Sequence, residues 1–441
     1  MLPDGKEVVR TSVLSTRWRS LWMSVPVSLD FSFSVGQGED EDEDDVVDFV
    51  TSTHRELHYW ISSQKIRKFR IFFDIRDEIF VRDVDSWVYF ATRLAKVEDF
   101  SLEFHSQYEL PQFAYKSTSL RNLSLHSCTV NPSGTVNWSC LISLSVNNLE
   151  LTEDLMKKVL SGCPNLECLQ LEFFWGIRRL EISNVKLRKL TINSFETDEG
   201  YGWLEIVAPY IQVLQLAGSC RGMRLRNMGS LVSAVLDLFD LDFGDGDKSK
   251  EESSCLKGLL HSLAQVDNLE IGSWCIKYMS TLALEGWQSQ PSSGRFLKIN
   301  TNLKELDFPG ICSFLKNSSH LQTLVIDWYN PDLKLQLPFH ITDRESRRFE
   351  THKFDCPLLH LKTIKFINLV GPLSENKFVL PLVKYFLENA IVLEKFEIAG
   401  RCRGSAMSQV HVKIEQELLR FPRSSPHASI VFSYQSPPDL D

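Results

Sequence analysis

The stretch Leu166-Glu167-Cys168-Leu169-Gln170-Leu171 decides the fold of this chain. Its first leucine turns the chain inward, and the last two reach a core from a short strand, because successive strand side chains point to opposite faces. Gln170 and Glu172 should therefore point outward. One such stretch cannot bury its apolar face alone, so the pattern predicts that similar stretches stack on one another.

The same L-x-x-L-x-L spacing recurs along most of the chain, with other apolar residues at some leucine positions. Successive copies start at Val97, Leu120, Leu141, Leu166, Leu187 and Ile211, and looser copies continue to Leu393. These starts follow the period of leucine-rich repeats. The sequence thus predicts an α/β leucine-rich-repeat solenoid, a curved parallel sheet with helices and irregular segments on its convex side.

One repeat shows both of its halves. Thr152 is expected to cap a helix, and Gly162 with Pro164 ends it just before the strand that Leu166 begins. Outward-facing residues of the strands and aromatic residues at two strand ends form the candidate substrate surface: Gln170, Glu172, Phe174, Trp175, Trp328 and Tyr329. Aromatic residues are common in binding hot spots, although packing between repeats is the alternative reading for them.

A second pattern lies near the start of the chain. Leu14, Trp18, Leu21 and Trp22 fall at i, i+4, i+7 and i+8, which places them on one face of a helix. A packing helix would explain this amphipathicity but not the order of residues in Val8–Trp22, which resembles the second half of a plant F-box.

That resemblance implies docking onto a Skp-type adaptor and, through it, a cullin–RING ubiquitin ligase that ubiquitinates a bound protein substrate. The positions that match the family's opening dipeptide and helical core are Leu2, Pro3, Val13, Leu14, Trp18, Leu21 and Trp22. Between Asp4 and Val8 the chain lacks the apolar helical run of the family, so we expect a truncated F-box. The alternative is a repeat-domain scaffold or decoy outside any ligase.

The C-terminal part resembles the FBD domain that closes many plant F-box/leucine-rich-repeat proteins. A helix over Phe378–Asn389 and strands over Val392–Ile398 and Ala428–Phe432 carry the resemblance. We therefore expect these divisions: a partial F-box over 1–33, an acidic linker over 34–48, the solenoid over 49–355, the FBD domain over 356–432 and a tail over 433–441.

Composition excludes several function classes. A net charge of −9 argues against nucleic-acid binding, and no apolar run is long enough to cross a membrane. The 10 cysteines form no C-x-x-C pair, which indicates neither a zinc site nor a secreted disulfide framework and favours the cytoplasm or nucleus. Nucleotide-binding and catalytic motifs are absent. We expect a binding protein without cofactor or metal, and not an enzyme.

Overall fold

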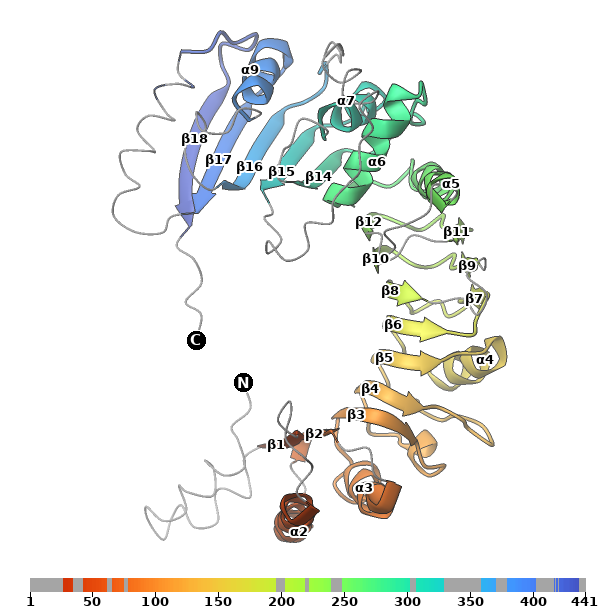
Figure 1. The fold of residues 1–441 in the computed structure, drawn as a ribbon. Helices are drawn as coiled ribbons and strands as arrows, with labels where there is room; N and C mark the ends of the chain where they lie inside the picture. The colour runs from red at the N-terminus through yellow and green to blue at the C-terminus, as the bar shows by residue number, and fades with distance from the viewer. Residues whose placement is uncertain are drawn as a thin grey trace. The chain divides into compact units, whose positions relative to one another are not determined.

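The structure is a computed structural model that describes residues 27–34, 43–61, 66–74, 78–195, 203–218, 222–238, 248–301, 307–328, 358–369, 379–401, 416, 418 and 420–435. The chain consists of two compact units. Unit 1 takes in residues 1–211 and 226–230, and unit 2 takes in residues 212–225 and 231–441. Each unit is built on a parallel sheet (Figure 1).

Neighbouring strands of the unit 1 sheet follow one another in chain order. They are β1 (Val27–Ser34), β2 (Ile66–Asp74), β3 (Asp99–Glu109), β4 (Asn122–Thr129), β5 (Ser143–Glu150), β6 (Cys168–Trp175) and β8 (Lys189–Phe195). Short strands β7 (Arg179–Glu181) and β9 (Leu204–Val207) pair separately. The helical segments are α2 (Glu43–Trp60), η2 (Glu78–Phe80), α3 (Val81–Tyr89), η3 (Phe90–Leu94), η4 (Ala114–Lys116) and α4 (Glu153–Gly162).

Unit 2 repeats this parallel arrangement. Its main strands are β10 (Val213–Gly218), β12 (Ser233–Leu238), β13 (Asn268–Ile271), β14 (Phe296–Thr301), β15 (Thr323–Trp328), β16 (Thr363–Leu369), β17 (Lys395–Arg401) and β18 (Ser429–Gln435). The remaining elements are β11 (Met223–Arg226), α5 (Lys248–Ser262), α6 (Ser273–Leu284), α7 (Phe308–Lys316) and α9 (Val379–Asn389).

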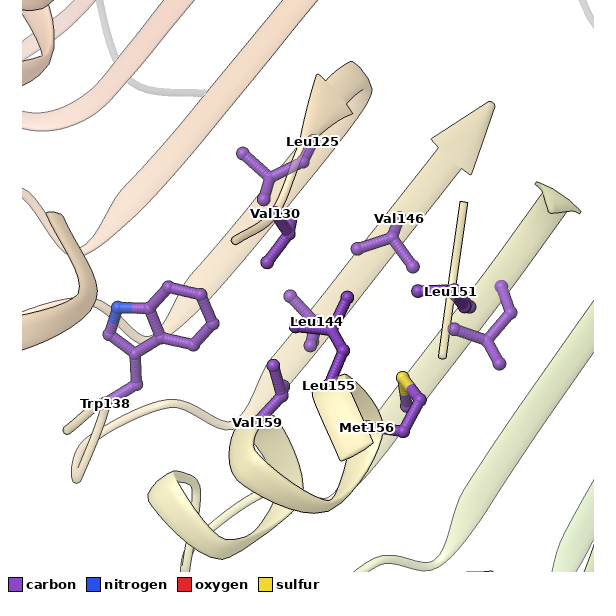
Figure 2. A pocket seen from close by; sticks show the side chains of 10 residues that line it. Leu125, Val130, Trp138, Leu144, Val146, Leu151, Leu155, Met156 and Val159 are labelled. Atoms are coloured by element: carbon purple, nitrogen blue, oxygen red, sulfur yellow. The ribbon is translucent and has the colours of Figure 1, made fainter. Parts of the chain in front are cut away.

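The repeat leucines form the core. Leu125, Val146, Leu171 and Ile192 occupy one register position on β4, β5, β6 and β8, and each is at most 4% exposed. Figure 2 shows this interior, where Val159 and Met156 of α4 face the core side chains of β5. Burying one such side chain contributes about 1.5–3 kcal/mol to the free energy of folding. A single repeat leaves these side chains exposed, and stacking the strands buries them. The predicted leucine-rich-repeat fold is confirmed.

Helix α4 begins and ends as its sequence predicts. The side-chain oxygen of Thr152 accepts a hydrogen bond from the backbone N–H of Leu155 at 3.2 Å, which caps the first turn. At the other end a Cβ on Gly162 would lie 2.7 Å from the Cβ of Val136. Glycine is therefore required there by close packing. In unit 2, helix α9 likewise agrees with the predicted Phe378–Asn389 helix to within one residue.

Three expected boundaries differ from the structure. The predicted tail over 433–441 overlaps strand β18, which ends at Gln435. Residues 27–33, assigned to the F-box part, form most of strand β1, which pairs with β2 because Val27, Leu29 and Phe31 alternate into the core. The supposed linker over 34–48 also overlaps α2, which starts at Glu43. Acidic residues favour a helix N-terminus, where they interact with the positive end of the helix dipole.

The F-box positions Leu2, Pro3, Val13, Leu14, Trp18, Leu21 and Trp22 lie outside the described residues. Within the described part of the chain, no helix combines the length and the apolar character that crossing a bilayer requires.

Candidate binding surface on the open face of unit 1

Polar side chains line up across the unit 1 sheet on the face opposite α4. Glu103, His126, Asn147, Glu172 and Asn193 are register partners on β3, β4, β5, β6 and β8. We call the sheet face that carries this row the open face of unit 1. Parallel strands in register bring these side chains together, although 90 residues of sequence separate the first from the last.

Hydrogen bonds fix the centre of the row. The Asn147 amide donates to Glu172 Oε2 at 2.7 Å, and the Gln170 amide donates to Glu172 Oε1 at 2.7 Å. Toward β1, His126 Nδ1 lies 3.8 Å from Glu103 Oε1, and Arg70 donates to Glu103 Oε2 at 3.3 Å. The Glu103 carboxylate therefore has a cationic partner, whereas the Glu172 carboxylate is held by neutral amides.

Just after this row, one residue in each of four strands adopts a left-handed backbone. Ser127, Asn148, Phe173 and Ser194 have φ values of 53°, 56°, 46° and 53°. Each is an extra residue in the strand pattern, because the pairing passes from Asn147↔Glu172 directly to Leu149↔Phe174. We call each of these left-handed residues a bulge. Neighbouring strands carry it at matching positions, so the register between strands is kept while the alternation of side chains reverses beyond it.

Because of the bulge in β6, one residue predicted to lie on the surface is buried. Strict alternation from Leu169 and Leu171 places Phe174 outward, but Phe174 is 1% exposed and Phe173 is 49% exposed. The prediction for Phe174 is wrong because the left-handed Phe173 takes the outward position and turns its neighbour into the core. Phe174 packs there against Phe195, with ring centroids 6.2 Å apart.

Beside the row, a pocket with a volume of about 340 Å³ opens on this face, lined by His126, Asn147, Asn148, Phe173 and Trp175. The bulge shapes it, because Asn148 and Phe173 are two of the left-handed residues. The Asn148 amide also donates to Ser127 Oγ at 2.8 Å, which links two bulges across neighbouring strands. The structure thus joins aromatic and polar side chains in one open pocket.

The predicted surface residues do not all meet there. Trp175 lines the pocket, while Gln170 and Glu172 lie beside it. Trp328 ends β15 in unit 2, and Tyr329 lies outside the described residues.

Sequence reasoning did not select His126, Asn147, Asn148 or Phe173. Asn148 was a usable signal, since Asn tolerates a left-handed backbone, but Ser127, Phe173 and Ser194 offered none.

In unit 2, the corresponding face carries ion pairs. Lys298 Nζ lies 3.0 Å from Glu270 Oε1 and 3.1 Å from Asp327 Oδ2, and Asn300 donates to Glu270 at 2.7 Å. Partial burial opposes the charge on Lys298, but its hydrogen bonds to these two carboxylates outweigh burial and raise its pKa. In the described ranges, no group of three or more His, Cys, Asp or Glu residues is arranged to hold a metal ion.

Comparisons with known proteins agree with this repeat architecture. Residues 61–420 match the family model of the leucine-rich-repeat domain of the At1g61320/AtMIF1 type. Three Arabidopsis thaliana proteins are similar to the chain. F-box protein At5g03100 is 30% identical over 64% of this chain and 87% of its own length. F-box/LRR-repeat protein At3g03360 is 28% identical over 72% and 65%. F-box/FBD/LRR-repeat protein At5g22700 is 26% identical over 90% and 88%.

The family match covers most of the chain and agrees with the parallel repeat sheets of both units. The chain belongs to the plant F-box/leucine-rich-repeat protein family.

Proposed function

We propose that the chain is the substrate-recognition subunit of a Skp–cullin–F-box type ubiquitin ligase. The N-terminal segment around Trp18 and Trp22 would bind the Skp-type adaptor, and the repeats would bind a protein substrate. The proposal gives the chain no catalytic step of its own, since ubiquitin transfer would belong to other subunits.

The observation that carries the proposal is the pocketed open face of unit 1 in a chain whose relatives are named F-box proteins. Its side chains are held in register by strands, so a partner would meet a preformed surface and lose little free energy to ordering it. Free thiols in the core, such as Cys128 and Cys163, support a reducing compartment, which we propose is the cytosol or nucleus.

A capture experiment with purified Skp-type adaptor tests the proposal. The full chain should retain the adaptor, and the double variant Trp18→Ala/Trp22→Ala should lose it. Trp175→Ala is the matched control, because it removes an indole from the substrate surface and should leave adaptor capture unchanged.

A chimera that carries a relative's F-box in place of residues 1–26 checks that the assay works. If the chimera binds the adaptor and the natural chain does not, the ligase role is rejected. A repeat-domain scaffold or decoy would then be the better assignment.

A further inference from the structure

The unit 1 pocket combines the features that recognise a planar cation. Phe173 is half exposed and Trp175 is partly buried, and both line the pocket. Aromatic faces attract guanidinium and ammonium groups through their negative quadrupole, and Trp does so most strongly. A carboxylate lies at the edge of the same pocket, because Glu172 accepts a hydrogen bond from the lining residue Asn147.

The charge on Glu172 is not neutralised within the described part of the chain, where none of the ion pairs involves it. Its two hydrogen bonds come from neutral amides, one to each oxygen. A carboxylate has about four lone-pair sites, so each oxygen keeps one acceptor site for a partner. That is the arrangement that a guanidinium fork can bind with two parallel N–H donors.

The carboxylate of Glu103, the register partner of the lining residue His126, is already engaged. Glu103 lies 3.3 Å from Arg70 and 3.8 Å from His126. The pocket volume of about 340 Å³ is at the lower end of the range of small-ligand sites, a size that suits one long side chain.

We infer that the pocket binds an arginine side chain of a protein substrate, with the guanidinium stacked on Trp175 or Phe173 and paired with Glu172. This inference rests on the proposed function, because it names the chemistry of the substrate that the repeats would present. Arginine fits better than lysine because its flat guanidinium can stack and fork at once, whereas an ammonium is a compact point charge.

The test uses the immobilised full chain and a library of random peptides. Selected peptides should be enriched in arginine, and replacing the critical arginine by citrulline should weaken binding at least about tenfold, about 1.4 kcal/mol. Citrulline keeps the shape of arginine and removes its charge. Glu172→Gln should weaken the binding of the arginine peptides to the same extent. In this variant, replacing arginine by citrulline should cause no further loss of affinity.

Glu181→Gln is the charge-matched control, because Glu181 lies on β7 outside the open face of unit 1. It should leave peptide binding unchanged, and melting temperatures should show that both variants remain folded. The inference is overturned if citrulline peptides bind within about twofold of arginine peptides or if Glu172→Gln binds them as well as the natural chain does.

Adaptor capture separates this result from the ligase proposal. Glu172→Gln should keep the adaptor. If the natural chain captures the adaptor but shows no preference for arginine peptides, only the pocket is rejected. If the natural chain shows that preference but does not capture the adaptor, only the ligase role is rejected.

Discussion

The two units carry their charges differently on the same strand geometry. In unit 2, Glu397 lies between two cations, with Lys365 Nζ at 3.0 Å and Lys395 Nζ at 2.9 Å, and Lys298 lies between Glu270 and Asp327. The Lys395–Glu397 pair lies within β17, and the other three pairs join neighbouring strands, so that each of these charged groups has an opposite partner.

The open face of unit 1 holds a carboxylate with neutral donors instead, and the bulge in β6 adds the half-exposed ring of Phe173. Neutral amides fix Glu172 in place without cancelling its charge. The comparison indicates that the ion pairs of the unit 2 face contribute to the stability of the fold. On the unit 1 face, the charge of the Glu172 carboxylate stays available to bind a partner. Four predictions test this difference.

The largest expected effect concerns the bulge that builds the unit 1 pocket. Phe174→Ala should lower the free energy of unfolding by about 3–5 kcal/mol, because it empties a fully buried site. Phe173→Ala should cost less than about 1 kcal/mol, because that ring is half exposed. Urea denaturation measures both, and equal losses would show that the bulge does not reverse the side chains as described.

The next effect concerns the unit 2 ion pairs. Lys298→Met should lower the free energy of unfolding by about 1–2 kcal/mol, because two partly buried carboxylates lose their shared cation. The matched control is Lys189→Met on the open face of unit 1, where the described residues give Lys189 no ion pair. It should change stability by at most about 0.5 kcal/mol. Similar losses in urea denaturation would remove the contrast between the units.

Acid should weaken unit 2 through Glu397. Its hydrogen bond from Lys395 lowers its pKa against the opposing effect of burial, and Lys365 lowers the pKa further. The folded pKa lies below the unfolded value, so this stabilisation is present above about pH 4.5 and is lost as pH falls through the folded pKa.

The measurement is the melting temperature between neutral pH and pH 3. Glu397→Gln should be less stable than the natural chain at neutral pH, and the difference should shrink in acid. Glu394→Gln, which removes an exposed carboxylate paired with Lys362 in the same unit, is the control. A constant difference across this range would contradict the role of Glu397.

The smallest effect concerns the reactivity of cysteine thiols and involves no change in the stability of the protein. Burial raises the pKa of the Cys163 and Cys275 thiols to about 12, so both should resist alkylation at pH 8 while the exposed Cys140 reacts. Mass spectrometry along a urea series should show the urea concentration at which each thiol is alkylated. Cys163 reports unit 1 and Cys275 reports unit 2, so separate labelling midpoints would show that the units unfold independently.

Spacing in the sequence was enough to predict the repeat strands and the capped helix α4. Leu169 and Leu171 must point to one side of a strand, and Thr152 has the side chain that a helix start requires, so local chemistry decided both. The short pair β7 and β9 was missed because three or four residues carry too little periodicity to be noticed. Phe174 was misplaced for a related reason, since a bulge changes the period without any change in composition.

The sequence by itself determined the stacked repeats, because apolar residues at a regular spacing can be buried only by neighbouring copies. Only the tertiary structure decided which polar residues share a surface. Glu172 meets Asn147 through strand register, and Phe173 reaches the pocket through a left-handed backbone. Register and bulges depend on contacts between strands that are distant in sequence, and no local pattern records those contacts.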